Sequence, residues 1–395
     1  VFGILIATQE RLFTFLEGQI FFLGKWSFGT ATLLGGIMVL AGGCFLLITG
    51  MRKMLLSIVD TVYPDRSVGF AQAVYHQRHL QKGPKIVVIG GGTGLSVLLR
   101  GLKSHTSNIT AIVTVADDGG SSGRLREELG ILPPGDIRNC MVALADTESL
   151  LDQLFQYRFK DGQYLEGHSM GNLLLAAMTN ITGSFDQGIK AMSRLLSIRG
   201  RVLPATLENV RLTARTSDGH VISGESAIPA SGQSISRVSL EPECCALPEA
   251  LEAIREADLI ILGPGSLYTS VLPNLLIKDL AAAIKGARGV KAYICNVMTQ
   301  PGETSGYGAA EHVQAIVDHV GHGIIDYVLV NNEQIPRELI GKYLEQGAQP
   351  VTPDAERLKR MGFQVVPANL VYKSNLVRHH PDKLSQAVLN LIIDK

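Results

Sequence analysis

The sequence predicts an α/β protein: a Rossmann-like, doubly wound, mostly parallel sheet with a helical and hairpin insertion, preceded by a transmembrane helix. Three observations support this prediction. Short apolar runs alternate with helix-like segments from Lys85 onward, a glycine-rich turn follows the first run, and a long stretch near the start carries no charge. At 395 residues the chain is too long for one simple core, so we expect more than one structural unit.

The uncharged stretch runs from Trp26 to Gly50 and contains no Asp, Glu, Lys or Arg. At about 1.5 Å per helical residue it exceeds the roughly 30 Å hydrocarbon thickness of a bilayer. A buried core helix and a secretory signal are the alternatives. Because Arg52 and Lys53 follow it, the positive-inside rule places the next domain in the cytoplasm. We therefore expect residues 1–50 to be a membrane anchor with its span at about 26–50, and a location at the cell membrane.

The residues before the span leave the number of membrane helices open. They are also apolar, but Glu10, Arg11 and Glu17 interrupt them. The span at 26–50 could therefore be the second helix of a hairpin. Residues 51–84 mix apolar and charged side chains, and we interpret them as a juxtamembrane connector made of short helices.

The main domain is expected over residues 85–395. Near-continuous apolar runs at 85–89, 109–115, 258–263, 290–297 and 326–332 predict buried parallel strands. Helix-like segments such as 276–286, 308–320 and 336–346 follow them. Residues 136–200 look mostly helical, and Asp218–Gly219 signals a hairpin. We therefore expect an insertion at about 136–240 between the two halves of the sheet.

Composition excludes several classes of function. Thirty-six basic residues balance thirty-six acidic ones, so no overall field attracts nucleic acid. The five cysteines form no C-x-x-C pair, which argues against a zinc site and against a disulfide framework. We expect neither zinc nor haem as a cofactor.

The turn "GGGTGLS" (90–96) ends the first predicted strand. Glycine lets the backbone approach a ligand closely, and free amides at a helix start favour an anion. We therefore expect Gly91, Gly92, Thr93 and Gly94 to contact phosphate, although a plain tight turn is the alternative. A dinucleotide fingerprint would place Gly or Ala at Leu95, so a nicotinamide cofactor is not expected.

Two adjacent carboxylates, Asp117 and Asp118, end the second predicted strand. Such oxygen ligands suit Mg²⁺, which retains waters and is shared with phosphates. Helix capping or a ribose contact are the alternatives. In "GGSSGRLR" behind them, Ser121, Ser122 and Arg124 could offset phosphate charge.

Further polar turns precede predicted helices or end predicted strands. In "LPPGDIRN" (132–139), Asp136 is expected to cap a helix and Arg138 is a candidate ligand contact. In "GHSMGN" (167–172), His168 and Asn172 are candidates, while serine hydrolysis is disfavoured because no strong strand precedes the turn. "LGPGSLYTSVLPN" (262–274) offers Gly265 and Ser266, and Asn296 ends the next strand.

Taken together, "VIGGGTGLSVLLRGLK", "VTVADDGGSSGRLREE", "LPPGDIRNCMVALA", "GHSMGNLLLAA" and "NVMTQPGET" resemble the YvcK/GlmR-type gluconeogenesis factors. These belong to the CofD-like superfamily, which includes 2-phospho-L-lactate transferase. The resemblance covers about Lys85 to Lys395 and implies a nucleotide-binding domain. It adds the Gly263–Ser266 turn, Tyr343 on a uracil base and Arg378 on a pyrophosphate. Residues 1–84 have no counterpart in that pattern.

The resemblance implies a regulator that binds UDP-N-acetylglucosamine and links carbon supply to cell-wall synthesis and cell shape. It would act through a protein partner still to be identified, and we expect a homo-oligomer. A Mg²⁺-dependent transferase of the 2-phospho-L-lactate type is the alternative. A nicotinamide oxidoreductase is a third and weaker hypothesis.

Overall fold

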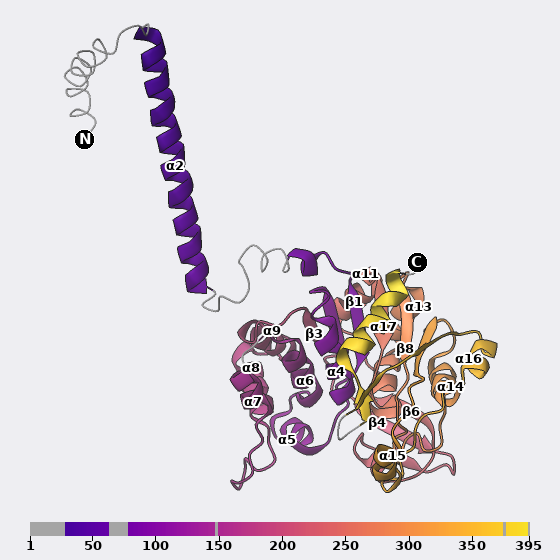
Figure 1. Ribbon diagram of the computed structural model, residues 1–395. Helices are drawn as coiled ribbons and strands as arrows, with labels where there is room; N and C mark the ends of the chain where they lie inside the picture. The colour runs from indigo at the N-terminus through magenta and orange to yellow at the C-terminus, as the bar shows by residue number, and fades with distance from the viewer. Residues whose placement is uncertain (1–27, 63–77, 147–148, 374–376, 394–395) are drawn as a thin grey trace. The chain divides into compact units, whose positions relative to one another are not determined.

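The computed structural model describes residues 28–62, 78–146, 149–373 and 377–393. The chain divides into two compact units, Val1–His76 and Gln77–Lys395. In the first unit, helix α2 (Phe28–Val62) is continuous for 35 residues (Figure 1). The expected connector therefore does not begin at residue 51, because the helix continues through that position. Within the described residues, Gly35–Met54 is the one helical segment long and apolar enough by itself to cross a membrane. The apolar stretch at 1–25 lies outside the described residues.

The second unit contains a seven-stranded sheet in the order β10-β9-β8-β7-β1-β2-β3, and every neighbouring pair is parallel. The predicted parallel α/β fold is confirmed. The strands are β1 (Ile86–Gly90), β2 (Ile109–Val113), β3 (Arg201–Pro204), β7 (Leu259–Leu262), β8 (Val290–Ile294), β9 (Tyr327–Asn331) and β10 (Gln364–Ala368). The strand order reverses direction between β1 and β7. Such a switch point is where ligands bind in doubly wound sheets.

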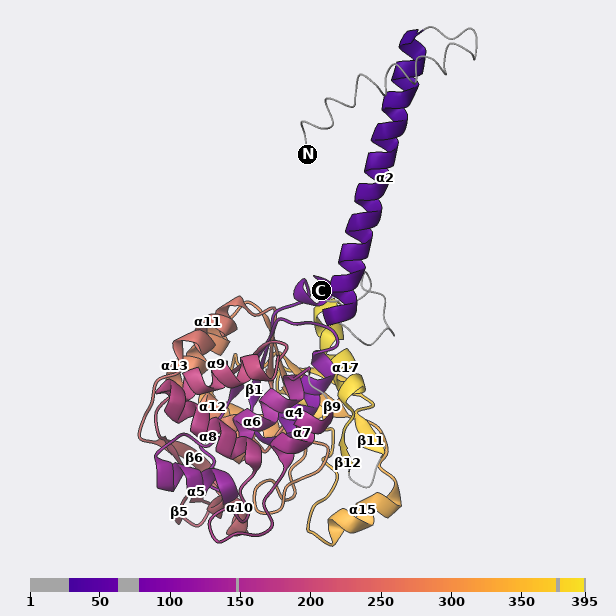
Figure 2. The ribbon, with the colours of Figure 1, turned by 90° about the vertical axis from the view of Figure 1, so that its left-hand side faces the viewer.

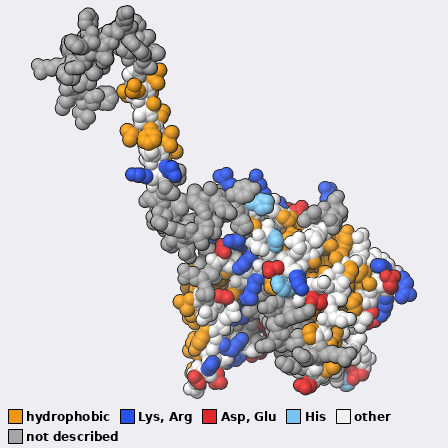
Figure 3. All heavy atoms as spheres, viewed as in Figure 1, with side chains coloured by type: hydrophobic (Ala, Val, Ile, Leu, Met, Phe, Trp, Pro, Cys, Tyr) orange, Lys and Arg blue, Asp and Glu red, His pale blue; other side chains and the backbone are white. Residues whose placement is uncertain are grey.

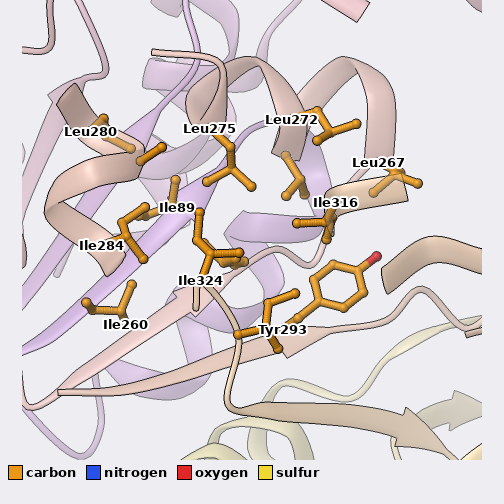
Figure 4. Packing of buried hydrophobic residues seen from close by; sticks show 14 of the residues in the cluster. Ile89, Ile260, Leu267, Leu272, Leu275, Leu280, Ile284, Tyr293, Ile316 and Ile324 are labelled. Atoms are coloured by element: carbon orange, nitrogen blue, oxygen red, sulfur yellow. The ribbon is translucent and has the colours of Figure 1, made fainter. Parts of the chain in front are cut away.

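Both faces of the sheet are covered, because successive side chains of a strand point to opposite faces. Ile86 and Val88 of β1 belong to the core that contains α4 (Gly92–Leu102), α6 (Gly135–Leu144) and α17 (Pro381–Ile393). Val87 and Ile89 belong to the core formed with α11 (Pro248–Glu256), α12 (Leu272–Leu275), α13 (Lys278–Gly286) and α14 (Ala309–Val320). Figure 4 shows this second core from close by, with Ile89, Leu275, Leu280 and Ile284 facing one another.

The segment expected as one insertion at 136–240 is divided by β3, which pairs with β2 in the main sheet. Its first part holds α6, α7 (Ser149–Gln156), α8 (Met170–Thr182) and α9 (Phe185–Leu195). Its second part is a separate sheet of β4 (Arg211–Thr216), β5 (Val221–Ser223) and β6 (Ile235–Glu241). The short helix α10 (Ala227–Ala230) lies between β5 and β6 in the chain. The hairpin predicted at Asp218–Gly219 joins β4 to β5, and Gly219 takes a positive φ there.

Helix α5 (Gly120–Leu129) follows β2, and a π-helical turn η2 (Leu267–Val271) follows β7. The C-terminal part adds α15 (Arg337–Leu344), α16 (Ala355–Arg360) and an antiparallel ribbon of β11 (Val371–Lys373) and β12 (Val377–His379). Figure 2 shows β11, β12 and α15 together on one side of the domain.

Candidate nucleotide-binding site

A cavity of about 610 Å³ lies at the carboxyl ends of the central strands. The turns that follow β1, β2, β7 and β8 line it, so it occupies the switch point of the sheet. It is large enough for a ligand of nucleotide size. Nine residues predicted from the sequence line it: Gly91, Gly92, Thr93, Gly94, Asp117, Gly265, Ser266, Asn296 and Tyr343.

Close backbone packing explains the glycines of the first turn. A Cβ atom at Gly94 would lie 2.7 Å from the carbonyl oxygen of Pro264, and one at Gly91 would lie 2.6 Å from Oδ2 of Asp136. Gly92 has a φ of +69°, which side chains rarely adopt. The turn after β1 and the turn after β7 therefore touch through their backbones. The start of α4 faces the cavity there, where its free amides suit an anion.

Two carboxylates from different segments line the cavity together. Asp117 follows β2, and one of its oxygens accepts a hydrogen bond from the Gly119 amide at 2.9 Å. Asp136 comes from the first turn of α6. Burial raises the pKa of Asp136 to about 6, and the neighbouring Asp117 adds to the rise. Burial also raises the pKa of Asp117.

Asp136 does not have the capping role expected from its position. Helix α6 begins at Gly135 with Pro134 as its N-cap, so Asp136 lies inside the first turn. Its carboxylate accepts from the Gly92 amide instead, which ties α6 to the glycine turn. The sequence did not indicate this position at the cavity, because Asp is also a common residue at the starts of helices.

The neighbouring Asp118 faces the small three-stranded sheet. Its carboxylate accepts hydrogen bonds from the amides of Glu225 and Ser226 at 3.1 and 2.9 Å, and from the Ser226 hydroxyl at 2.8 Å. Asp118 is not among the residues that line the cavity. The bonds hold Glu225 at the cavity wall, where burial and the nearby Asp117 raise its pKa to about 8. Nothing in the sequence around Glu225 marked it as a site residue.

Three predicted contacts form a buried cluster next to the cavity. The Ser121 hydroxyl lies 2.9 Å from Nδ1 of His168 and accepts from Nδ2 of Asn172 at 3.0 Å. All three side chains are buried, and none lines the cavity. Ser122 also lies outside the lining and accepts from the Gly135 amide at 3.2 Å. These four residues join α5 to α6 and α8.

The predicted phosphate-binding arginines hold backbone carbonyls. Arg124 donates to the Glu166 carbonyl at 2.6 Å, and Arg138 donates to that of Phe155 at 3.4 Å. Neither lines the cavity, and Gly263 also lies outside its lining. Arg378 lies in β12, but its side chain is outside the described residues. No Lys or Arg side chain among the described residues lines the cavity.

The other end of the cavity is more apolar. Val297, Met298, Pro301 and Tyr343 line it. The segment after β8 is held there because the Thr299 amide donates to the Gln349 carbonyl at 2.8 Å. A tyrosine ring beside aliphatic side chains suits a planar base. One end therefore offers amides and carboxylates, and the other offers an apolar wall.

The chemistry of the carboxylates fits a Mg²⁺ ion that is completed by a ligand. Mg²⁺ is usually held by one or two carboxylates together with waters and substrate phosphates. Asp117 and Asp136 would supply these two, with Glu225 nearby. Within the described residues, no group of three or more His, Cys, Asp or Glu side chains is arranged to hold a metal by itself. The geometry does not favour the predicted pairing of Asp117 with Asp118, because Asp118 does not line the cavity and its oxygens accept from Glu225 and Ser226.

Comparison with known proteins agrees with this architecture. The family described as 2-phospho-L-lactate transferase CofD matches residues 86–371. The gluconeogenesis factor of Bacillus subtilis is 57% identical over 311 residues, which cover 78% of this chain and 98% of that protein. This chain belongs to the CofD family, among the gluconeogenesis factors.

A solved relative shows the same fold within this family. The crystal structure of a Bacillus halodurans protein matches with a TM-score of 0.77 and 55% identity. The match covers 78% of this chain and 100% of the Bacillus halodurans chain. In these Bacillus relatives the CofD domain is therefore nearly the whole protein.

The N-terminal region has a counterpart in other members of the family. A relative from Nostoc sp. (strain PCC 7120) is 50% identical over 382 residues, which cover 96% of this chain and 84% of that protein. A relative from Clostridium acetobutylicum covers 91% of this chain. The expectation that residues 1–84 have no counterpart in the family was therefore wrong.

Proposed function

We propose that this CofD-family protein is a regulator that binds a nucleotide sugar, UDP-N-acetylglucosamine, and links gluconeogenic growth to cell-wall synthesis and cell shape. The observation that carries the proposal is the two-ended cavity at the switch point. Amides of the glycine turn suit a diphosphate and the Asp117–Asp136 pair suits a Mg²⁺ ion bound to it, while the wall around Tyr343 suits a uracil base.

In this proposal, Mg²⁺ lies between the carboxylates and the diphosphate. The cavity lining offers three carboxyl groups and no Lys or Arg among the described residues. A ligand with two phosphate charges would be repelled by this wall, and a divalent cation removes the repulsion. Ligand binding should therefore depend strongly on Mg²⁺.

A Mg²⁺-dependent transferase is the second candidate. The pair Asp117 and Asp136 favours it, because carboxylates that position a metal on a diphosphate can also assist transfer. The same cavity would then hold an activated donor. The residues on the chain would position the reactants and offset charge.

Calorimetry on the fragment 77–395 separates the two candidates. UDP-N-acetylglucosamine, GTP and NAD are titrated with and without Mg²⁺, and each mixture is assayed for product. Micromolar binding of the sugar nucleotide without turnover supports the regulator. Product formation from a nucleotide donor would replace it with the transferase, and tight binding of NAD alone would overturn both.

We also propose that the protein is attached to the membrane through the span at Gly35–Met54, with its CofD domain in the cytoplasm. The supporting observations are the length and composition of α2 and the basic residues Arg52 and Lys53. Such attachment would place a sensor of cell-wall precursors at the membrane. An unidentified protein partner and a homo-oligomer remain part of the proposal.

A further inference from the structure

Charge is unevenly distributed between the carboxyl ends and the amino ends of the strands in the main sheet. The whole chain has equal numbers of basic and acidic residues. The cavity at the carboxyl edge is lined by Asp117, Asp136 and Glu225. At the opposite side of the sheet, where the strands begin, three segments lead into β1, β2 and β3. They are residues 78–85, 100–105 and 194–201. Together these segments contain eight Lys and Arg residues and no Asp or Glu.

Hydrogen bonds hold these three segments near one another. Nδ2 of Asn108, which lies between the segment 100–105 and β2, donates to the carbonyls of Gln81 and Gly83 at 2.9 and 2.7 Å. Nη1 of Arg199 donates to the Lys103 carbonyl at 3.4 Å. We call the segments 78–85, 100–105 and 194–201 the basic edge. In Figure 3 several Lys and Arg groups lie along the upper border of the domain, where Figure 1 shows the chain entering β1.

The acidic residues near the basic edge are already engaged. Asp146 pairs with Arg199 at 2.7 Å, and Glu256 pairs with Lys85 at 2.9 Å. Asp258 accepts from the Lys85 amide at 2.8 Å. Four exposed cations of the basic edge have no acidic partner within the described residues: Arg78, Lys82, Arg100 and Arg194. This edge therefore retains a positive charge that the fold itself does not neutralise.

A recess of about 360 Å³ opens on the same edge. Lys85, Asn108, Arg201 and Glu256 are among the residues that line it. Nη2 of Arg201 donates to the Thr110 hydroxyl at 3.3 Å, so its guanidinium is held beside the recess. A basic recess with amide and hydroxyl groups suits a phosphate headgroup.

We infer that the basic edge docks on the anionic lipid surface of the membrane, with the nucleotide cavity at the opposite edge open to the cytoplasm. The inference rests on the proposed membrane attachment. The chain that leads to the candidate span leaves the CofD domain at Arg78, within the basic edge. Anionic headgroups attract clustered Lys and Arg beside a span, and the attraction weakens beyond a Debye length of about 8 Å.

Vesicle sedimentation of the fragment 77–395 tests the inference. This fragment corresponds to nearly the whole length of the Bacillus relatives, so it is a complete domain. It is mixed with vesicles of phosphatidylcholine alone, or with 30% phosphatidylglycerol, in low and high salt. We expect binding only to the anionic vesicles, and at least a tenfold loss of binding in high salt. Equal binding to neutral vesicles, or none to anionic ones, would overturn the inference.

Charge reversal locates the surface. The variant Lys82→Glu/Arg100→Glu/Arg194→Glu should bind anionic vesicles at least about tenfold more weakly. The matched control Lys160→Glu/Arg215→Glu/Arg237→Glu changes net charge equally at exposed positions away from the basic edge, and it should retain binding. An equal loss in both variants would show that net charge alone is responsible and would overturn the inference.

Two further measurements separate this inference from the proposed function. Binding of UDP-N-acetylglucosamine should be the same in both charge-reversal variants, because the cavity lies at the other edge. Absence of nucleotide-sugar binding together with vesicle binding would overturn the proposed ligand and leave the docking surface intact. Binding of the fragment to a short RNA duplex but not to anionic vesicles would instead assign the basic edge to nucleic acid.

Discussion

The carboxylate of Asp118 accepts a hydrogen bond from the Ser226 hydroxyl at 2.8 Å, and neither of these residues lines the cavity that Asp117 lines. Two adjacent acidic residues therefore have different roles. Asp117 faces the cavity, and Asp118 fastens the turn after β5 to the turn after β2. This division leads to predictions that distinguish binding from stability.

Replacing Asp117 with Asn should weaken ligand binding far more than folding. The substitution removes a negative charge from the proposed Mg²⁺ site, and it relieves the like-charge repulsion with Asp136. We expect at least a tenfold loss of affinity for UDP-N-acetylglucosamine with Mg²⁺, and little change in the denaturation midpoint. Calorimetry and urea unfolding measure the two quantities, and unchanged affinity would remove Asp117 from the site.

Replacing Asp118 with Ala should have the larger effect on stability. The change leaves the amides of Glu225 and Ser226 and the Ser226 hydroxyl without their acceptor. Each lost partner of this kind costs on the order of 1 kcal/mol, so we expect about 1–3 kcal/mol in the free energy of unfolding. Urea unfolding of Asp118→Ala beside Asp117→Asn provides the comparison. A larger loss of stability in Asp117→Asn would contradict the assignment.

Gly94→Ala should disrupt the cavity through a backbone clash. The added Cβ would lie 2.7 Å from the Pro264 carbonyl oxygen, and a backbone atom cannot move aside as a flexible side chain can. We expect a loss of about 1–3 kcal/mol in stability and weaker ligand binding. Gly286→Ala is the control, because a Cβ there meets nothing within 4 Å. Similar behaviour of the two variants would show that the two turns do not pack as described.

Ionisation of Glu303 should cost the ligand-free domain stability as pH rises from about 4.5 to 7. Glu303 is buried, its Oε1 accepts from the Thr269 hydroxyl at 3.1 Å, and its Oε2 has no partner within the described residues. Burial raises the pKa of Glu303 to about 7. At Glu303 the folded state therefore binds more protons than the unfolded chain across this window, and the contribution of this carboxyl to stability falls with rising pH until it is ionised.

Glu303→Gln should reduce this pH dependence, because the amide stays neutral at every pH. Between pH 5 and 7.5 we expect the unfolding free energy of this variant to fall less, or rise more, than that of the unchanged chain, by an amount on the order of 1–3 kcal/mol. Glu356→Gln on the exposed surface of α16 is the control. Denaturation at several pH values gives the measurement, and an unaltered slope would show that Glu303 does not titrate there.

The full chain should fractionate with membranes, and the fragment 77–395 should be released by high salt. An apolar span anchors a chain irreversibly, whereas electrostatic docking is reversible. Fractionation with carbonate and salt washes, followed by immunodetection, distinguishes the two. Recovery of the full chain entirely in the soluble fraction would contradict the span at Gly35–Met54.

The amino-acid sequence was sufficient to predict the fold class and the glycine turn that lines the cavity. Buried parallel strands need continuous apolar runs, and the backbone contact at Gly94 tolerates no side chain, so both leave local marks in the sequence. Which polar groups share the cavity depends on the tertiary structure, because they come from segments far apart in the sequence. Asp117 and Asp118 are indistinguishable by position, yet the turn after β5, which carries Ser226, engages the carboxylate of only Asp118. Asp136 and Glu225 reach the cavity from segments distant in sequence, and such long-range contacts leave no periodic signal.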